Sequence, residues 1–396
     1  MELSLCMIVK NEELTLPSCL GSVKGVVDEI VVLDTGSSDR TCEVAKEFGA
    51  RVYDFVWCND FSKARNAALK YVQADWILVL DADEVLAPEI VPILQQAIKR
   101  DSYLVINLVR REVGAAQSPY SLVSRLFRNH PDICFSRPYH ALVDDSVSQI
   151  LSKETNWQIG YLPQVAILHS GYQKRAIAQG DKFAKAQTAM EGFLAAHPTD
   201  PYVCSKLGAL YVQTGNYARG IELLERGIAS KGVNAQILYE LHYHLGIAYT
   251  RLERTQEAIA HYHSAIQLSI YPMLKLGAYN NLGNLKLAAR DLTGAKTAYE
   301  MALQIDPNFA AGHYNLGMAL KAQGYFQDAI AAYQQAIALN PNYAEAYQNL
   351  GVVLLKVGKL PESLAAFGRA IALHEQQNPI AAQSLRQGLQ EMGFQV

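Results

Sequence analysis

The sequence predicts a two-domain protein: an α/β domain with an open, Rossmann-like sheet, followed by an all-α array of repeated helical hairpins. In the first half, short apolar runs alternate with stretches of helical pattern. In the second half, one pattern of Gly, aromatic, Ala and Pro residues recurs every 34 residues. Because helices rarely continue past the residue before a proline, we place the boundary at Pro198, giving domains 1–197 and 198–396.

Composition excludes several classes of protein. Of 396 residues, 50% are hydrophobic and 18% are charged, as in a folded rather than a disordered chain. The net charge is −3 and no basic stripe stands out, so nucleic acid is not an expected partner. The six cysteines form no Cys-x-x-Cys pair, which favours a reduced, cytoplasmic setting. No run approaches the roughly 18 to 20 apolar residues of a transmembrane segment.

The first domain is predicted to contain a β-α-β-α-β-α-β unit. Its strands are the apolar runs LSLCMIV, EIVVLD, ARVYDFVW and WILVL, and helical segments lie between them. Three of these strands are followed by polar loops, KNEE, DTGSSD and DADE. In open α/β sheets ligands bind beyond the carboxyl ends of the strands, so these loops predict one site at that edge. In DADE, Asp81 and Asp83 are spaced so that both can approach one hard cation where the strand breaks.

The second domain resembles the tetratricopeptide repeat (TPR) family. Gly283, Gly317 and Gly351 follow one another at intervals of 34, each with a later aromatic residue and Ala. Two looser copies precede them, giving about five repeats, and the tail predicts a C-terminal capping helix. The physical reason for the pattern is that a small residue lets two helices approach while an aromatic ring fills the remaining groove. Stacking such units buries a continuous core and builds a superhelix.

The first domain resembles the GT-A glycosyltransferases of inverting family 2, in particular bacterial members fused to TPRs. The resemblance rests on MIVKNEE, VVLDTGSSDRT, FSKARNAALKYVQADWILVLDADE, RLFRN and ILHSGY, which occur in that order over almost the whole first half. It implies transfer of a sugar from a UDP-sugar donor with Mn²⁺ or Mg²⁺ by a single inverting displacement. It leaves both the sugar and the acceptor open.

The resemblance also implies roles for individual residues. Asp34 would contact the uracil or ribose, and the loop with Val9, Asn11 and Glu12 would flank the base. Arg65 would lie near the nucleotide, and Asp81 would touch the ribose and reach the metal through water. Asp83 would bind the metal directly and His169 would approach both metal and diphosphate; imidazole suits Mn²⁺ better than Mg²⁺.

The catalytic base stays open at this point. Relatives often carry a His-Glu pair soon after the RLFRN strand, whereas this sequence has His140 followed by Ala141. The base that takes the acceptor proton is therefore His140, Asp144 or Asp145, or Glu84 at the edge of the acidic motif.

Two further patterns lie in the array. Asn281, Asn315 and Asn349 recur at 34-residue spacing and suggest a ladder of amides that holds the backbone of a polypeptide acceptor. Homodimerisation and a purely structural role are the alternatives. The pairs His242/His244 and His261/His263 have i, i+2 spacing, which puts the members of a pair on different helix faces, so packing or solvation is expected.

Two other functions are compatible with parts of the sequence, a sugar nucleotidyltransferase and a TPR scaffold. A sugar nucleotidyltransferase uses a similar sheet, but it opens with a Gly-rich, basic loop after the first strand, and MIVKNEELTLP contains none. A TPR scaffold with an inactive transferase domain is favoured by the missing Glu at position 141. The intact DADE, DTGSSD and ARN segments argue against it.

Overall fold

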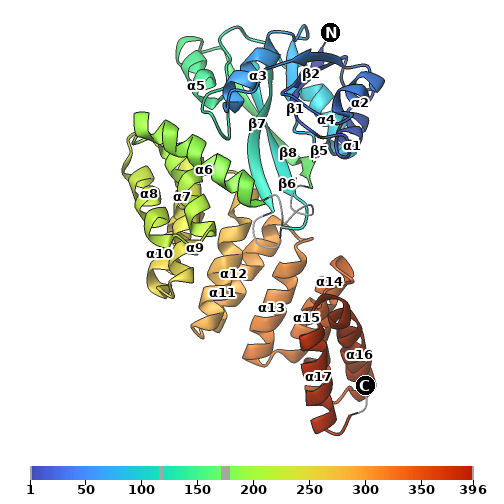
Figure 1. Cartoon of the computed structure of the whole chain (residues 1–396). Coiled ribbons are helices and arrows are strands. Elements are labelled where there is room, and N and C mark those ends of the chain that lie inside the picture. The colour runs from blue at the N-terminus through green and yellow to red at the C-terminus, as the bar shows by residue number, and fades with distance from the viewer. Residues whose placement is uncertain (1, 116–118, 171–178, 395–396) are drawn as a thin grey trace. The chain divides into compact units, whose positions relative to one another are not determined.

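A computed structural model describes residues 2–115, 119–170 and 179–394 (Figure 1). The chain divides into two compact units, Met1–Ala115 with Pro119–Gly215, and Asn216–Val396. The predicted boundary at Pro198 thus falls inside the first unit, which includes α6 (Gln179–Ala196) and α7 (Pro201–Gln213). Among the helices of the described residues, none is long and apolar enough to cross a membrane.

The parallel half of the sheet matches the prediction. Strands β1 (Leu3–Val9), β2 (Glu29–Asp34), β3 (Arg51–Asp54) and β4 (Trp76–Val79) lie in the order β3-β2-β1-β4, and each neighbouring pair is parallel. The connecting helices are α1 (Leu16–Ser22), α2 (Thr41–Glu47) and α3 (Phe61–Leu69). The carboxyl ends of β1, β2 and β4 therefore meet at one edge, where the three polar loops begin.

The second half of the sheet is mixed, which the sequence did not predict. The complete order is β3-β2-β1-β4-β7-β6-β8-β5; β7 is antiparallel to β4 and to β6, whereas β8 is parallel to β6 and antiparallel to β5. These strands are β5 (Glu84–Leu86), β6 (Tyr103–Glu112), β7 (Tyr120–Arg128) and β8 (Gln158–His169). The short helices of this half are η1 (Pro88–Ile90), α4 (Val91–Ala97) and α5 (Asp144–Lys153).

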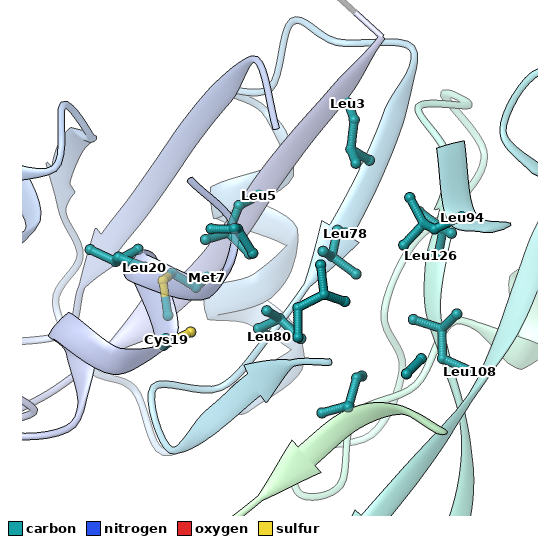
Figure 2. Packing of buried hydrophobic residues seen from close by; sticks show 14 of the residues in the cluster. Leu3, Leu5, Met7, Cys19, Leu20, Leu78, Leu80, Leu94, Leu108 and Leu126 are labelled. Atoms are coloured by element: carbon teal, nitrogen blue, oxygen red, sulfur yellow. The ribbon is translucent and has the colours of Figure 1, made fainter. Parts of the chain in front are cut away.

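Both faces of the sheet are covered, which explains why its strands are continuously apolar. Along β1, Leu5 and Met7 point into a core shared with α1 and α4, seen in Figure 2. Cys6, between them, points into the opposite core, which is shared with α3 and α5. Successive side chains of a strand alternate between the two faces. The sheet edge at which the polar loops begin is therefore stabilised by a hydrophobic core on each face of the sheet.

The second unit consists of antiparallel helix pairs. After α8 (Tyr217–Ala229) come the pairs α9 (Ala235–Arg251) with α10 (Thr255–Gln267), α11 (Leu276–Ala288) with α12 (Leu292–Ile305), α13 (Ala310–Gln323) with α14 (Phe326–Leu339), and α15 (Ala344–Lys356) with α16 (Leu360–Gln377). A short η2 (Pro272–Lys275) precedes α11. The last helix, α17 (Pro379–Glu391), packs on α16, as the predicted capping helix should.

Glycine and an aromatic ring set the spacing within each pair, as the repeat pattern predicts. A Cβ atom built on Gly317 would lie 2.6 Å from the Tyr333 ring, and one on Gly283 would lie 2.5 Å from Tyr299. Tyr299 and Tyr333 are fully buried. The ring of the second helix thus occupies the space that a side chain on the first helix would need, and only glycine fits there.

Candidate functional site

The loop after β2 is organised by Asp34. The carboxylate of this buried residue accepts hydrogen bonds from the backbone N–H groups of Gly36 (3.0 Å) and Ser37 (2.9 Å) and from the Ser37 hydroxyl (2.5 Å). Gly36 has φ +98°, a conformation that favours glycine. Asp34 therefore shapes the DTGSSD turn itself, and its contact with a nucleotide stays a prediction.

The loop after β1 is fastened to that turn. Asn11, at φ +54°, accepts a hydrogen bond from the Ser38 N–H through its side-chain oxygen (2.8 Å). The Glu12 N–H donates to the Thr41 hydroxyl (2.7 Å), and the Val9 carbonyl accepts from the Thr35 N–H (3.0 Å). The structure thus brings Val9, Asn11, Glu12 and Asp34 together, as the sequence predicts for the loops flanking a base.

The first aspartate of the acidic motif is bound by two arginines. Asp81 Oδ1 lies 2.6 Å from Arg65 Nη2, and Asp81 Oδ2 lies 3.0 Å from Arg125 Nη2. Burial alone would raise the pKa of Asp81, but the charges of Arg125 and Arg65 hold it well below its ordinary value. Asp81 is therefore an ionised carboxylate whose two oxygens are already engaged by cations of the chain.

The last residue of the motif, Glu84, is a structural anchor. It is fully buried, and its carboxylate accepts from Arg110 Nη1 (3.0 Å) and from the Asp81 N–H (2.8 Å). A carboxylate held this way has no route to an acceptor hydroxyl. This corrects the suggestion that Glu84 is a candidate base, because its ion pair and burial give it the task of closing the turn.

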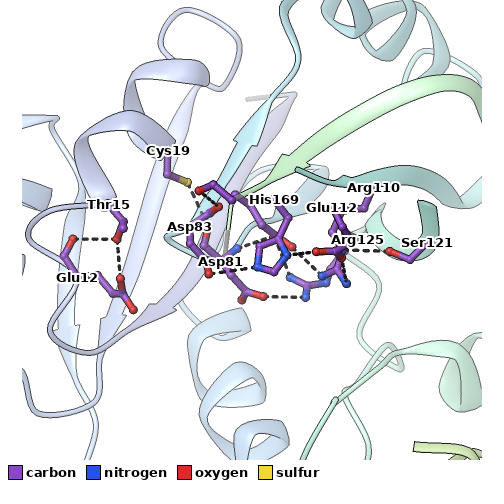
Figure 3. A network of polar contacts seen from close by, with 12 residues as sticks. Glu12, Thr15, Cys19, Asp81, Asp83, Arg110, Glu112, Ser121, Arg125 and His169 are labelled. Carbon is purple, nitrogen blue, oxygen red and sulfur yellow. Dashed lines mark hydrogen bonds and ion pairs between the residues drawn. The ribbon is translucent and has the colours of Figure 1, made fainter. Parts of the chain in front are cut away.

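Asp83 and His169 meet on the other side of the motif (Figure 3). Asp83 Oδ2 lies 3.1 Å from His169 Nε2, and the Ser170 N–H donates to the Asp83 carbonyl (3.2 Å). The other ring nitrogen, His169 Nδ1, is hydrogen-bonded to Glu112 Oε2. Burial lowers the pKa of His169, but the hydrogen bonds and charges of Asp83 and Glu112 outweigh this and raise it to about 10.

The donor chemistry of this pair fits a divalent cation. The Asp83 carboxylate oxygen and the His169 Nε2 atom are 3.1 Å apart, close enough for both to bind one cation, and both side chains are partly exposed. Among the residues that the structure describes, no three His, Cys, Asp or Glu side chains form a metal-binding group. Asp81 turns to Arg65 and Arg125, so among the described residues of the motif and its surroundings Asp83 and His169 would supply two ligands, and substrate or water could supply others.

The loop that follows β7 carries the candidate bases. Arg137 in this loop has φ +72°, and its guanidinium forms ion pairs with Asp145 and with Asp200 (Nη2 to Oδ2, 2.8 Å). His140 has φ +51°, and its carbonyl accepts from the Tyr202 hydroxyl (3.1 Å). Asp200 and Tyr202 belong to the start of α7, which therefore supports the loop.

Asp144 differs from its neighbour Asp145. Asp145 is tied to Arg137 and accepts from the Ser136 hydroxyl (2.6 Å). Asp144 accepts a hydrogen bond from the Ser124 hydroxyl of β7 (3.0 Å). Its side chain keeps contact with solvent, yet the protein atoms packed around the carboxyl raise its pKa by desolvation, against the opposing effect of the Ser124 hydrogen bond. A raised pKa is the property that a general base needs.

Several residues of the site were missed by the sequence reasoning. Arg125, Arg110 and Glu112 form the charged frame around DADE, and Asn66 holds the loop after β7 through Phe135, accepting from its N–H at 2.7 Å and donating to its carbonyl at 2.9 Å. Arg125 and Asn66 lie in the quoted RLFRN and ARN segments, so they could have been found there. Arg110 and Glu112 come from β6, where only the pairing of distant strands reveals their position.

In the array, the asparagine amides contact neighbouring repeats. Asn315 Nδ2 donates to Asn280 Oδ1 (2.8 Å), and Asn349 Nδ2 donates to the Tyr314 hydroxyl (3.1 Å). Asn281 is buried and donates to the Tyr262 hydroxyl (3.2 Å). This corrects the hypothesis of an amide ladder for a peptide backbone, because these amides bond to helices of the preceding repeat.

The histidines of the array also contact one another. His242 on α9 and His261 on α10 place their Nδ1 atoms 2.9 Å apart, so one member of each i, i+2 pair meets one member of the other. Burial, with a smaller contribution from His261, lowers the pKa of His242 to about 4. The expectation of packing is confirmed for these two, and His263 is exposed.

Comparisons with known proteins identify the class. The family model described as glycosyl transferase family 2 matches residues 4–160, and models described as TPR or tetratricopeptide repeats match residues 205–271, 283–324, 317–358 and 344–376. A glycosyltransferase of Rickettsia typhi is 28% identical over 201 residues, covering 48% of this chain and 68% of the relative. The SPbeta prophage-derived glycosyltransferase SunS of Bacillus subtilis is 26% identical over 199 residues, covering 49% of this chain and 46% of SunS. The fold and the acidic edge therefore belong to a glycosyltransferase.

A more similar relative matches about three quarters of the chain. A TPR repeat-containing protein of Synechococcus elongatus is 44% identical over 303 residues, covering 76% of this chain and 74% of the relative. Among solved structures, MamA (21% identity, TM-score 0.39, 45% of this chain and 93% of MamA) and YrrB (17% identity, TM-score 0.42, 51% of this chain and 100% of YrrB) are similar. The chain belongs to the family of TPR repeat-containing proteins with an N-terminal family 2 glycosyltransferase domain.

Proposed function

We propose that this glycosyltransferase uses a UDP-sugar donor and a divalent cation, Mn²⁺ or Mg²⁺, and transfers the sugar by a single inverting displacement. The observation that carries the proposal is the approach of Asp83 Oδ2 to His169 Nε2 (3.1 Å). It lies at the sheet edge where the loops after β1 and β2 also begin. Nucleotide and cation would then lie side by side, as a nucleoside diphosphate requires.

Each loop has a part in donor binding. The loops with Asn11 and Asp34 are held rigid by their mutual hydrogen bonds, so they would present a preformed surface to the base and ribose. Arg65 and Arg125 stay cationic beside Asp81 and add positive charge near the diphosphate. Asp83 and His169 would hold the cation, which when bound offsets the charge of the diphosphate and makes it a better leaving group.

For the base, we propose Asp144 ahead of His140 and Asp145. Asp145 is engaged by the Arg137 guanidinium and by the Ser136 hydroxyl, so its carboxylate already has two partners within the chain. Asp144 has the raised pKa described above and is the first residue of α5, which directly follows the loop that contains Tyr139. In that loop the Asp81 charge contributes, after burial, to the raised pKa of Tyr139. In this proposal Asp144 takes the proton of the acceptor as the acceptor attacks the sugar.

For the partners, we propose a polypeptide acceptor or partner bound by the repeat array, because stacked repeats present extended surfaces of the kind that bind peptides. Homodimerisation through the array is the alternative. Light scattering of the full chain distinguishes the two: a mass of one chain, with binding of a polypeptide, favours the first, whereas a mass of two chains favours the second.

Donor binding is tested by isothermal titration calorimetry. We expect UDP to bind with Mn²⁺ present and to lose most of its affinity in EDTA, with GDP binding more weakly. Equal binding of UDP and GDP would contradict the UDP assignment. No binding of either, with or without Mn²⁺, would favour the alternative function, a TPR interaction scaffold with an inactive transferase domain.

A further inference from the structure

Glu112 contacts His169, the proposed metal ligand, at the ring nitrogen that does not face Asp83. It is the last residue of β6, and the parallel pairing of β6 with β8 places it opposite His169. On the other edge of β8, the pairing with β5 places Glu84 opposite the same histidine. His169 on β8 thus lies between β6 and β5 in the sheet. This register brings Glu112 to its Nδ1 atom, and Asp83, the residue before β5, to its Nε2 atom.

The contacts of His169 are directional. Its Nδ1 atom is hydrogen-bonded to Glu112 Oε2, whereas its Nε2 atom faces Asp83 Oδ2 at 3.1 Å. A carboxylate at Nδ1 can only accept, so the Nδ1 atom carries the proton. The other nitrogen, Nε2, faces the Asp83 carboxylate in the same way, so without a cation it also donates; a bound cation would take the place of that proton between Nε2 and Asp83.

Glu112 is itself held in place. Its Oε1 atom lies 2.9 Å from Arg110 Nη2, and the same guanidinium reaches Glu84 Oε1 at 3.0 Å through Nη1. The Glu112 side chain is only 12% exposed and the Glu84 side chain only 1%. Arg110 therefore links buried Glu84 of the acidic turn to Glu112, and its charge holds the Glu112 carboxylate in place. Figure 3 shows Arg110 beside Glu112.

We propose that Glu112 is a positioning residue for the divalent cation: it holds the His169 ring with Nδ1 as donor and Nε2 directed at the site shared with Asp83. Outer carboxylates that orient metal-binding histidines usually contribute about 10- to 100-fold to metal affinity. Arg110 supports this role through its bond to Glu112. The inference rests on the proposed metal dependence and adds a residue that does not itself touch the cation.

The test is Mn²⁺ affinity of the full chain, measured by the electron paramagnetic resonance signal of free Mn²⁺. We expect Glu112→Ala to bind Mn²⁺ about 10- to 100-fold more weakly than wild type. Glu112→Gln should lose less, because its amide oxygen can still accept from Nδ1. The matched control is Glu43→Ala on α2, which removes an exposed glutamate that forms an ion pair with exposed Arg40, and it should bind as wild type does.

A second readout separates orientation from folding. Long-range ¹H–¹⁵N spectra of histidine-labelled protein report which ring nitrogen of His169 carries the proton, and we expect the Nδ1-protonated form to be weakened in both Glu112 variants. If Asp83→Ala abolishes Mn²⁺ binding but both Glu112 variants bind like wild type, the positioning role is wrong and the metal site stands. If wild type binds no Mn²⁺, or Asp83→Ala binds it unchanged, the proposed site and the role of Glu112 are both wrong.

Discussion

The carboxylate of Asp81 lies between two guanidinium groups, 2.6 Å from Arg65 Nη2 and 3.0 Å from Arg125 Nη2. Asp83, two residues later, turns instead to His169. The two aspartates of one short motif therefore have different environments. The first stabilises the cationic frame of the site, and the second pairs with His169, with which we propose it holds the cation.

This difference predicts unequal effects of the two substitutions on stability. Asp81→Asn should lower the free energy of unfolding by about 1–3 kcal/mol, because Arg65 and Arg125 lose the partner that offsets their burial. Asp83→Asn should cost less, about 1 kcal/mol or below, because it weakens one ion pair with His169 that is partly exposed to solvent. Urea unfolding followed by circular dichroism measures both. Equal losses in the two variants would contradict the division of roles.

The base assignment predicts a kinetic difference. Asp144→Asn should lower kcat of sugar transfer by roughly 10²- to 10⁴-fold with donor affinity unchanged, because the acceptor proton loses its base. Transfer of radiolabelled sugar from a UDP-sugar to acceptors in a cell lysate gives the rate. Asp145→Asn and His140→Ala are the comparison variants. A near-normal rate in Asp144→Asn would place the base elsewhere.

The repeat packing predicts a glycine-specific loss of stability. In Gly317→Ala the new methyl group would lie 2.6 Å from the Tyr333 ring, so the helices must separate, at a cost of about 1–3 kcal/mol. Gly388→Ala on α17 is the matched control. A Cβ there meets nothing within 4 Å, and alanine should raise stability by up to about 1 kcal/mol. Thermal unfolding of both variants gives the comparison, and similar stability in the two would refute the packing argument.

The histidine pair of the array predicts a pH dependence of stability. The pKa of His242 is lowered to about 4, below the ordinary value of about 6.5 expected in the unfolded chain, so the unfolded chain binds more protons between these values. Stability should be complete above pH 6.5 and should fall as pH decreases toward 4. Because the pair is half-buried, we expect a loss of about 1 kcal/mol.

The control for this prediction is a second histidine in the same helix pair. His242→Gln should reduce the loss of stability between pH 7.5 and pH 5, whereas the exposed His263→Gln should retain the wild-type loss. Urea unfolding at several pH values measures it. An unchanged pH profile in His242→Gln would show that the titrating group is a different one.

The sequence predicts the parts of this protein that depend on local pattern. The parallel strands, the polar loops at their ends and the 34-residue repeats follow from burial on both faces and from the fit between Gly317 and Tyr333. Asp83 and His169 were recognised by resemblance. The mixed half of the sheet was not predicted, because β6, β7 and β8 pair across long sequence separations. Arg110 and Glu112 were missed for the same reason: their place beside the motif depends on that pairing.

The central claim, metal-dependent use of a UDP-sugar, is tested most directly by UDP release from a panel of UDP-sugars with the full chain. We predict turnover of at least one UDP-sugar with Mn²⁺ or Mg²⁺, its loss in EDTA, and its loss in Asp83→Ala with an unchanged circular dichroism spectrum. Undiminished UDP release in EDTA or in Asp83→Ala would contradict the account.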